Sequence, residues 1–204
     1  MSADLNFTSL ICSRLCHDLV GPVGAISNGI ELMEMEDDPE MMKDALDLLK
    51  HSATNASRRL RFLRLAFGSS GGDEMPLPVG DARQAAQDFY VDHRLELNWP
   101  DNGSSPSKGR IRLALNLIMA GASGLVRGGD LMVDLDDARL AIAGNHDRAA
   151  LPDAVIEALE GRRDVAGGED ARIIESFLAS RLAVAEGLTI SVDQQPGRFT
   201  ISAR

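Results

Sequence analysis

The chain has 204 residues, of which 44% are hydrophobic, and it carries a formal net charge of −10 at neutral pH. This size and composition suffice for an apolar core in one large or two small domains. The acidic balance argues against a nucleic-acid partner, because phosphate contacts need a clustered basic face. The sequence has neither a signal-peptide pattern nor an apolar run of about 18 residues, so we expect a cytoplasmic protein without a membrane partner.

Residues 4–36 are predicted to form a long amphipathic helix. Its apolar side has helical spacing and consists of Ile11, Leu15, Leu19, Pro22, Ile26, Ile30 and Met33. His17 falls on the opposite side, where its neighbours are Ser13, Gly21, Gly24 and Asn28. Glycine inside a helix costs roughly 1 kcal/mol relative to alanine. We therefore expect this bare surface to serve the close approach of another protein to an exposed His17.

The cysteines and the other histidines offer no metal site. Cys12 and Cys16 are the only cysteines and lie four residues apart on the first helix. That spacing suits neither a structural disulfide nor a haem attachment site, and we expect buried hydrophobic side chains rather than metal ligands. His51, His93 and His146 are scattered along the chain and are predicted to be surface or packing residues.

A second long helix follows a tight acidic turn, in which Asp38 is predicted to cap the helix and Pro39 to begin it. Its apolar residues alternate by four and three, as in a coiled coil, at Met42, Leu46, Leu49, Ala53, Ala56, Leu60, Leu63 and Phe67. The resulting hairpin leaves an apolar flank at Val20, Val23, Ala45 and Leu48. We therefore expect a homodimer with a four-helix bundle. The alternative is a monomer whose hairpin packs on its own C-terminal part.

Basic residues gather at the level of His17, because an antiparallel hairpin brings position 58 beside position 17. They are Arg14 on the first helix and Arg58, Arg59, Arg61 and Arg64 on the second. Most acidic residues of the hairpin lie instead between positions 31 and 47, toward the turn. Such a pattern is often only a solvated face. Beside an exposed histidine, however, it favours a site that meets anionic chemistry.

A linker over residues 71–78 is predicted to separate the hairpin domain, residues 1–70, from an α/β domain, residues 79–204. Hydrophobic patterns predict helices at 79–93, 107–126, 152–159 and 170–185, and strands at 95–99, 131–135, 140–143, 188–192 and 199–202. These elements predict an α/β sandwich with a mixed sheet. The whole chain is therefore predicted to belong to the α+β class.

The motif His-Asp-Leu-x-x-Pro at residues 17–22 resembles the H-box of sensor histidine kinases. Residues 115–118 with Gly128 and Gly129 resemble the start of the N-box in the ATP-binding (Bergerat) domain of those kinases, and residues 176–200 resemble its last helix and hairpin. The nucleotide chemistry is missing. Ala120 replaces the magnesium-binding asparagine, Gly144 replaces the adenine-reading aspartate, and residues 173–175 replace the glycine-rich lid. We expect a degenerate domain that binds no ATP.

A kinase-shaped chain that keeps the histidine and loses ATP binding resembles the ChpT-type histidine phosphotransferases of alphaproteobacterial cell-cycle control. The resemblance covers nearly the whole chain. It implies a homodimer that relays phosphoryl groups, through His17, from the receiver domain of a CckA-like hybrid kinase to the receivers of CtrA-like and CpdR-like response regulators. The chain itself is expected to bind no cofactor, and Mg²⁺ is expected on the partner receiver.

The residue types fit this chemistry, since a neutral imidazole at His17 can attack an aspartyl phosphate. Asp18 resembles the acidic kinase residue that hydrogen-bonds the other ring nitrogen, and a plain charge on the helix surface is the alternative. We expect the receiver to bind at Ser13, Arg14, Gly21, Gly24, Arg58, Arg59 and Arg61. Two further functions stay open, a noncatalytic dimeric scaffold for receivers and a true ATP-dependent kinase. The missing nucleotide-binding residues argue against the kinase.

Overall fold

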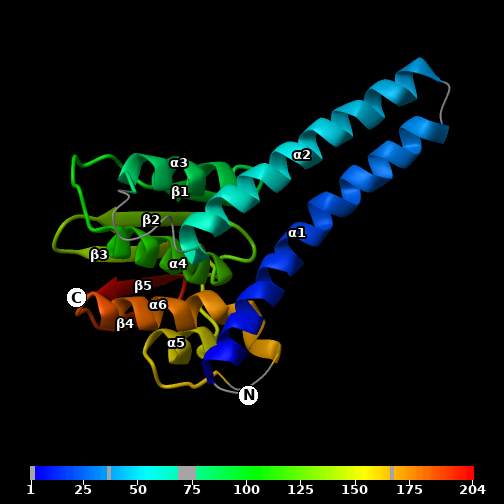
Figure 1. Cartoon of the computed structure of the whole chain (residues 1–204). Coiled ribbons are helices and arrows are strands. Elements are labelled where there is room, and N and C mark those ends of the chain that lie inside the picture. Colours follow the sequence, from blue (N-terminus) through cyan, green and yellow to red (C-terminus); the bar gives the residue numbers. More distant parts are fainter. Residues whose placement is uncertain (1–2, 36–37, 69–76, 166–167) are drawn as a thin grey trace.

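A helical hairpin projects from an α/β domain in the computed structural model, which describes residues 3–35, 38–68, 77–165 and 168–204 (Figure 1). The hairpin consists of α1 (Ala3–Met35) and α2 (Pro39–Phe67). Asp38 caps α2 as predicted, because its Oδ1 accepts a hydrogen bond from the backbone N–H of Glu40 at 3.0 Å, and Pro39 is the first helical residue. Most of the predicted linker, residues 71–76, lies outside the described residues, so the domain boundaries stay a prediction.

The face of α2 that packs on α1 coincides only in part with the predicted seam, with which it shares Leu49, Ala56 and Leu63. Buried or half-buried residues along it are Ala45, Leu49, Ser52, Ala56 and Leu63. Met42, Leu46 and Leu60 of the predicted seam are instead 37%, 40% and 54% exposed, and Ala45, predicted for the open flank, is buried. One cause is Gly29 of α1, where a Cβ would lie only 2.8 Å from Cγ of Leu49. The helices therefore approach closely along the line of Leu49, and a second apolar line of α2 stays exposed.

The C-terminal part consists of five helices and five strands among the described residues. They are α3 (Val79–Tyr90), β1 (Leu95–Asn98), α4 (Lys108–Ser123), β2 (Gly129–Leu135), β3 (Leu140–Asn145), α5 (Asp153–Leu159), the 3₁₀ helix η1 (Gly168–Ile173), α6 (Ile174–Ala185), β4 (Ile190–Gln195) and β5 (Arg198–Ala203). The predicted helix at 79–93 ends three residues early, at Tyr90, and the predicted helix at 170–185 is divided between η1 and α6.

The strands form one mixed sheet in the order β1-β2-β3-β5-β4, with β1 parallel to β2 and the other pairs antiparallel. Alternate residues are buried along β2 and β5, namely Leu131, Val133, Leu135, Phe199, Ile201 and Ala203. Helix α4 packs on β2 and β3, and α6 packs beside α4 (Figure 1). The result is a two-layer α/β sandwich with one solvent-facing side, which confirms the predicted α+β class.

Two hydrophobic clusters join the base of the hairpin to the sandwich. Phe62, Leu63, Leu65 and Ala66 of α2 belong to the large core of the C-terminal part. Phe7 and Leu10 of α1 form a second cluster with Ala158, Ile174 and Phe177. This packing holds α1 against η1 and α6. None of the helices in the described part of the chain is long and apolar enough to cross a membrane.

Candidate functional site

His17 lies midway along α1, and its side chain is 82% exposed. Its Nδ1 is 3.2 Å from Oδ1 of Asp18, the next residue in the chain. The imidazole borders a pocket of about 350 Å³ that is also lined by Ser13, Arg14, Ala171 and Arg172. The exposure predicted from helical periodicity is thus present in the structure, and η1 supplies the opposite wall of the pocket.

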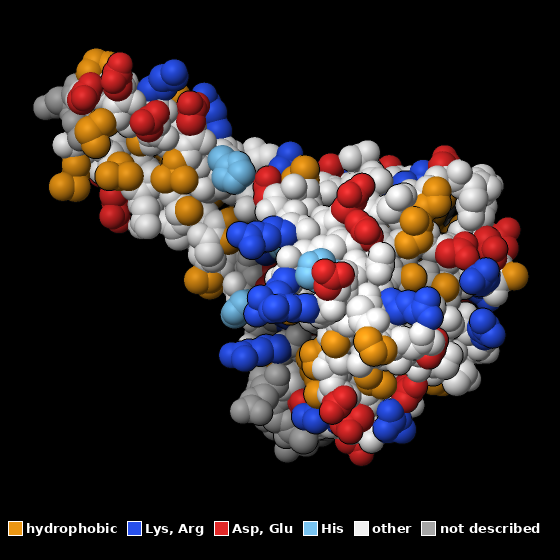
Figure 2. All heavy atoms as spheres, turned by 180° about the vertical axis from the view of Figure 1, so that it is seen from behind, with side chains coloured by type: hydrophobic (Ala, Val, Ile, Leu, Met, Phe, Trp, Pro, Cys, Tyr) orange, Lys and Arg blue, Asp and Glu red, His pale blue; other side chains and the backbone are white. Residues whose placement is uncertain are grey.

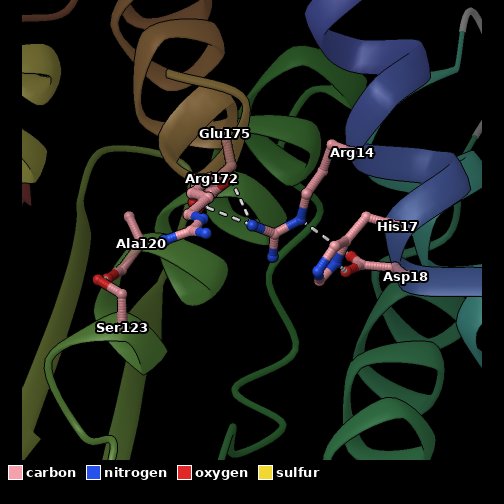
Figure 3. Close-up of polar contacts among 7 residues, drawn as sticks. All are labelled: Arg14, His17, Asp18, Ala120, Ser123, Arg172 and Glu175. Carbon is pink, nitrogen blue, oxygen red and sulfur yellow. Dashed lines mark hydrogen bonds and ion pairs between the residues drawn. The ribbon is translucent and has the colours of Figure 1, made fainter. Parts of the chain in front are cut away.

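Asp18 connects His17 to Arg14 (Figure 3). Its Oδ2 accepts a hydrogen bond from Nε of Arg14 at 2.9 Å, and its side chain is only 10% exposed. A plain charge on the helix surface, the alternative left open above, would be solvated. The two oxygens of Asp18 are instead engaged by two different side chains of α1.

Arg14 reaches across from α1 to the C-terminal part (Figure 3). Its Nη1 donates to the carbonyl oxygen of Arg172 at 2.9 Å and lies 3.7 Å from Oε2 of Glu175. We expected Arg14 to bind a receiver. The structure engages its guanidinium with three groups of the chain itself, and only 23% of the side chain is exposed.

Glu175 is the buried carboxylate of this network, with a side chain only 1% exposed in the first turn of α6. Burial raises the pKa of Glu175 to about 7, although the Arg14 charge acts in the opposite direction. Burial by itself lowers the pKa of Arg14, but the carboxylates of Glu175 and Asp18 outweigh it and raise that pKa. Burial also raises the pKa of the nearby Tyr90 phenol, and Glu175 adds to this shift.

A second pocket, of about 280 Å³, lies beside the first, between the hairpin and the sandwich. Arg14, Asp18 and Glu175 line it together with Arg59 of α2. Nε of Arg59 donates to Oδ1 of Asn55 at 2.9 Å, and its guanidinium lies 5.3 Å from the centre of the Phe89 ring. Of the three predicted receiver-binding arginines on α2, Arg59 is the one that lines a pocket together with Asp18.

His93, predicted to be a surface or packing residue, also borders the second pocket. Its ring stacks on that of Phe89 at a centroid distance of 5.7 Å. Burial, and secondarily the charge of Arg59, lower the pKa of His93. This packing agrees with the prediction.

Arg58 and Arg61 occupy a different part of the surface. Arg58 lies 3.7 Å from a carboxylate oxygen of Asp92, and Arg61 lies 3.6 Å from one of Asp88. Figure 2 shows Lys and Arg side chains with histidines where the hairpin meets the sandwich, whereas hydrophobic and acidic side chains, with some Lys and Arg among them, gather toward the hairpin tip. The predicted polarity of the hairpin is therefore visible, but nearby acidic groups partly neutralise these two arginines.

The surface of α1 at Gly21 and Gly24 is open, whereas the prediction for the two cysteines is wrong. A Cβ at Gly21 or Gly24 would meet no other atom within 4 Å, so packing within the chain does not require either glycine. Cys12 and Cys16 were predicted to be buried, and this is wrong, because both are exposed. They lie at helical spacing with Val20 and Val23, which neither α2 nor the sandwich covers.

The sequence did not identify Arg172 or Glu175 as site residues. Glu175 offered a weak indication, because it is a charged residue between apolar neighbours at the start of a helix. Ala120, which stands at the asparagine position of the kinases, contributes only a buried methyl group on α4 (Figure 3). Within the described ranges, no three His, Cys, Asp or Glu side chains are grouped as metal ligands.

Comparisons with known proteins agree with one another. The family described as "Histidine phosphotransferase C-terminal domain" matches residues 79–198. Protein phosphotransferase ChpT of Brucella abortus (strain 2308) is 35% identical over 205 residues, which cover 98% of this chain and 95% of that protein. A solved structure of a bacterial phosphotransferase matches with a TM-score of 0.83 and 31% identity, covering 98% of this chain and 96% of the other. The chain therefore belongs to the histidine phosphotransferase family.

Proposed function

We propose that this phosphotransferase relays phosphoryl groups between aspartates of receiver domains, with His17 as the transient carrier. The observation that supports this most directly is the geometry of His17, which is exposed beside a pocket while Asp18 occupies Nδ1. A proton on Nδ1, donated to Asp18, leaves the lone pair of Nε2 free to attack.

The proposed reaction needs no group from outside the two partners. Nε2 of His17 attacks the phosphorus of an aspartyl phosphate, the bond between phosphorus and the aspartate oxygen breaks, and the receiver regains its carboxylate. The imidazolium that forms is stabilised by the Asp18 carboxylate. Transfer to a second aspartate reverses these steps. Phosphoryl transfer depends mainly on positioning and charge neutralisation, and we propose that the receiver supplies Mg²⁺ for the latter.

We propose that the pocket beside His17 and the surface of α1 around it bind the receiver. Ser13 lines this pocket, and Gly21 and Gly24 leave α1 open to close approach. The exposed Arg172 borders the same pocket, and we add it to the predicted receiver-binding residues. The resemblance to ChpT-type proteins favours a CckA-like hybrid kinase receiver as donor and CtrA-like and CpdR-like regulators as acceptors.

We further propose a homodimer with a four-helix bundle, because the outer hairpin exposes many large apolar side chains. They are Val20, Val23, Ile30, Leu32, Met35, Met41, Met42, Leu46, Leu48 and Leu60. A groove near the tip is lined by five residues, of which only Asp44 is charged. Exposed apolar patches of this kind mark protein interfaces, and burying each large side chain stabilises an assembly by roughly 1.5 to 3 kcal/mol.

We propose that the reaction does not use ATP. Gly144 stands where the kinases carry the adenine-reading aspartate, and a Cβ there would collide with the ring of Phe199. The same ring, only 1% exposed, lies close to Gly124 and Gly121. An aromatic side chain thus fills the space over these glycines. Addition of ATP with Mg²⁺ should give neither autophosphorylation nor a rise in melting temperature, since a ligand stabilises only a protein that binds it.

The decisive experiment incubates the chain with a receiver domain that carries labelled aspartyl phosphate. We expect acid-labile label on the wild-type chain and none on His17→Ala, which should fold normally because the side chain is exposed. Label on His17→Ala would contradict the assignment. A chain that binds receivers without ever becoming labelled would indicate the noncatalytic scaffold.

A further inference from the structure

A chain of four ionisable groups connects the C-terminal part of the protein to the His17 ring (Figure 3). It runs from Glu175 of α6 to Arg14, from Arg14 to Asp18, and from Asp18 to Nδ1 of His17. Only the last two groups belong to the motif shared with sensor kinases. Arg14 precedes that motif, and Glu175 lies in the last third of the sequence.

We propose that Arg14 and Glu175 are positioning residues for phosphoryl transfer, by which the C-terminal part of the chain orients Asp18 and thereby the ring of His17. This inference rests on the proposed function. It gives the C-terminal part of the chain, which lacks the nucleotide-binding residues of the kinases, a role in the transfer step in addition to any contact with the receiver.

Arg14, rather than the helix backbone, orients the carboxylate of Asp18. Adjacent residues on a helix point about 100° apart, so Asp18 has no fixed orientation toward His17 from the backbone alone. Arg14 lies one turn earlier on the same face and donates to Oδ2 of Asp18 at 2.9 Å. This bond fixes the plane of the carboxylate, which leaves Oδ1 directed at Nδ1 of His17.

The long side chain of Arg14 needs a restraint of its own. A free arginine loses about 2 kcal/mol of rotamer entropy when it is fixed. Here Nη1 of Arg14 donates to the carbonyl oxygen of Arg172 at 2.9 Å and lies 3.7 Å from Oε2 of Glu175. Both anchoring groups come from η1 and α6, which pack against α1.

The carboxylate of Glu175 is costly to bury. Its Oε2 is buried and makes no hydrogen bond to the described residues, so the ion pair with Arg14 is its compensation. A buried charge pair is a weak source of stability, and well-packed apolar residues often replace one without loss. Fixing the direction of Arg14 is a use that an apolar residue could not serve.

The groups that face Glu175 come from several elements. Arg14 and Asp18 lie on α1, Tyr90 on α3, His93 just after α3, Arg59 on α2 and Arg172 on η1, and all of them line the same pocket as Glu175. Because burial favours the neutral form of Glu175 near neutral pH, loss of its charge weakens the hold on Arg14. We therefore expect the order of the His17 ring to depend on the ionisation of Glu175.

The test uses the full chain with ¹⁵N-labelled histidine and needs no mutation for its first measurement. Ring nitrogen shifts should show the proton of neutral His17 on Nδ1 in the wild type. In Glu175→Gln and Arg14→Gln the shifts should move toward an average of both tautomers. Arg83→Gln is the control, because Arg83 of α3 pairs at 3.0 Å with Asp101 of the same domain and belongs to neither η1 nor α6, and it should leave the His17 shifts unchanged.

Transfer kinetics provide the second readout. At saturating phosphorylated receiver, Glu175→Gln and Arg14→Gln should slow labelling of His17 roughly ten- to hundredfold. Glu175→Gln should do so with an unchanged dissociation constant for the receiver. Arg83→Gln should retain the wild-type rate. His17→Ala, assayed in parallel, tests the proposed function separately, because it alone should abolish labelling.

Three outcomes would overturn the inference. One is a mixed tautomer at His17 of the wild type. Another is a wild-type labelling rate in both positioning variants. The last is an equal loss of rate in Arg83→Gln, which would make the effect one of general stability. In each case a wild type labelled at His17 would leave the proposed relay intact.

Discussion

Gly21 and Gly24 lower the stability of α1 without a packing requirement inside the chain. A Cβ at either position would meet no other atom within 4 Å, whereas Gly29 in the same helix is needed for the approach of Leu49. The glycines beside His17 therefore fit a surface that a receiver approaches closely. Their cost in helix propensity, roughly 1 kcal/mol each relative to alanine, is then explained by binding rather than by folding.

Gly24→Ala should raise the free energy of unfolding by about 1 kcal/mol and weaken receiver binding several-fold, because the added methyl lies on the docking surface. Urea denaturation and titration with a receiver measure the two effects. Gly80→Ala is the control, since Gly80 of α3 is equally open and far from His17 along the chain. It should stabilise the protein without changing receiver affinity. Equal receiver affinity in Gly24→Ala would contradict the docking surface.

Glu175 should make stability depend on pH. Its pKa is raised to about 7 in the folded chain, so between about pH 4.5 and about pH 7 the folded state keeps a proton that the unfolded state loses. The stabilising effect of this proton is complete below that window and is lost as the pH rises through it. Glu175→Gln removes this dependence. Between about pH 5 and about pH 8, the free energy of unfolding of the variant should therefore rise relative to that of the wild type by on the order of 2 to 3 kcal/mol.

Denaturant unfolding at several pH values checks this prediction. Parallel pH profiles for wild type and Glu175→Gln would show that the carboxyl group does not titrate in that window.

At the scale of elements, strong periodicity predicted most helices and strands, but not which faces meet. The hairpin, the cap at Asp38 and the mixed sheet were all predictable, because each depends on local patterns. The packing face of α2 was predictable only in part: Leu49, Ala56 and Leu63 of the predicted seam lie on it, whereas Met42, Leu46 and Leu60 are exposed. A 3.6-residue turn drifts relative to a heptad, and the close approach of Gly29 to Leu49 is a tertiary contact that no local pattern contains.

The candidate site likewise combines residues that local patterns predict with contacts that only the folded chain brings together. His17, its exposure and its bare neighbours follow from positions on one helix. The link from Arg14 to Glu175 joins residues far apart in the sequence, and it depends on the docking of η1 and α6 against α1. Arg58 and Arg61 were expected to bind the receiver, but Asp92 and Asp88 are acidic partners of these arginines that the hairpin pattern alone could not indicate.

Arg58→Glu should slow association with an acidic receiver at low salt, with a smaller effect at high salt, because surface charges mainly steer the encounter. Asp92 already offsets part of the Arg58 charge, so the loss should be moderate. Stopped-flow association rates at several salt concentrations measure it. Lys43→Glu near the hairpin tip changes net charge equally and should have less effect. Indistinguishable rates for the two variants would argue against a basic docking face.

At the scale of the whole molecule, the exposed apolar surface of the hairpin predicts assembly. Leu48→Asp should break or loosen the dimer, since an unpaired carboxylate in an apolar interface costs several kcal/mol. The single chain should still fold, because Leu48 is 41% exposed in it. Val184→Asp is the control, since Val184 is 75% exposed on the C-terminal part. Light scattering should show a dimer for wild type and Val184→Asp, and a wild-type monomer at micromolar concentration would contradict the four-helix bundle.

The most direct test of the account follows one phosphoryl group through the protein. A labelled phosphoreceiver is mixed with the chain, a second receiver is added, and both the label and its site are followed by gels and by mass spectrometry that preserves phosphohistidine. We predict label first on the donor, then transiently on His17, and finally on the second receiver. Label that reaches the second receiver without passing through His17, or that rests on another residue of the chain, would contradict the relay.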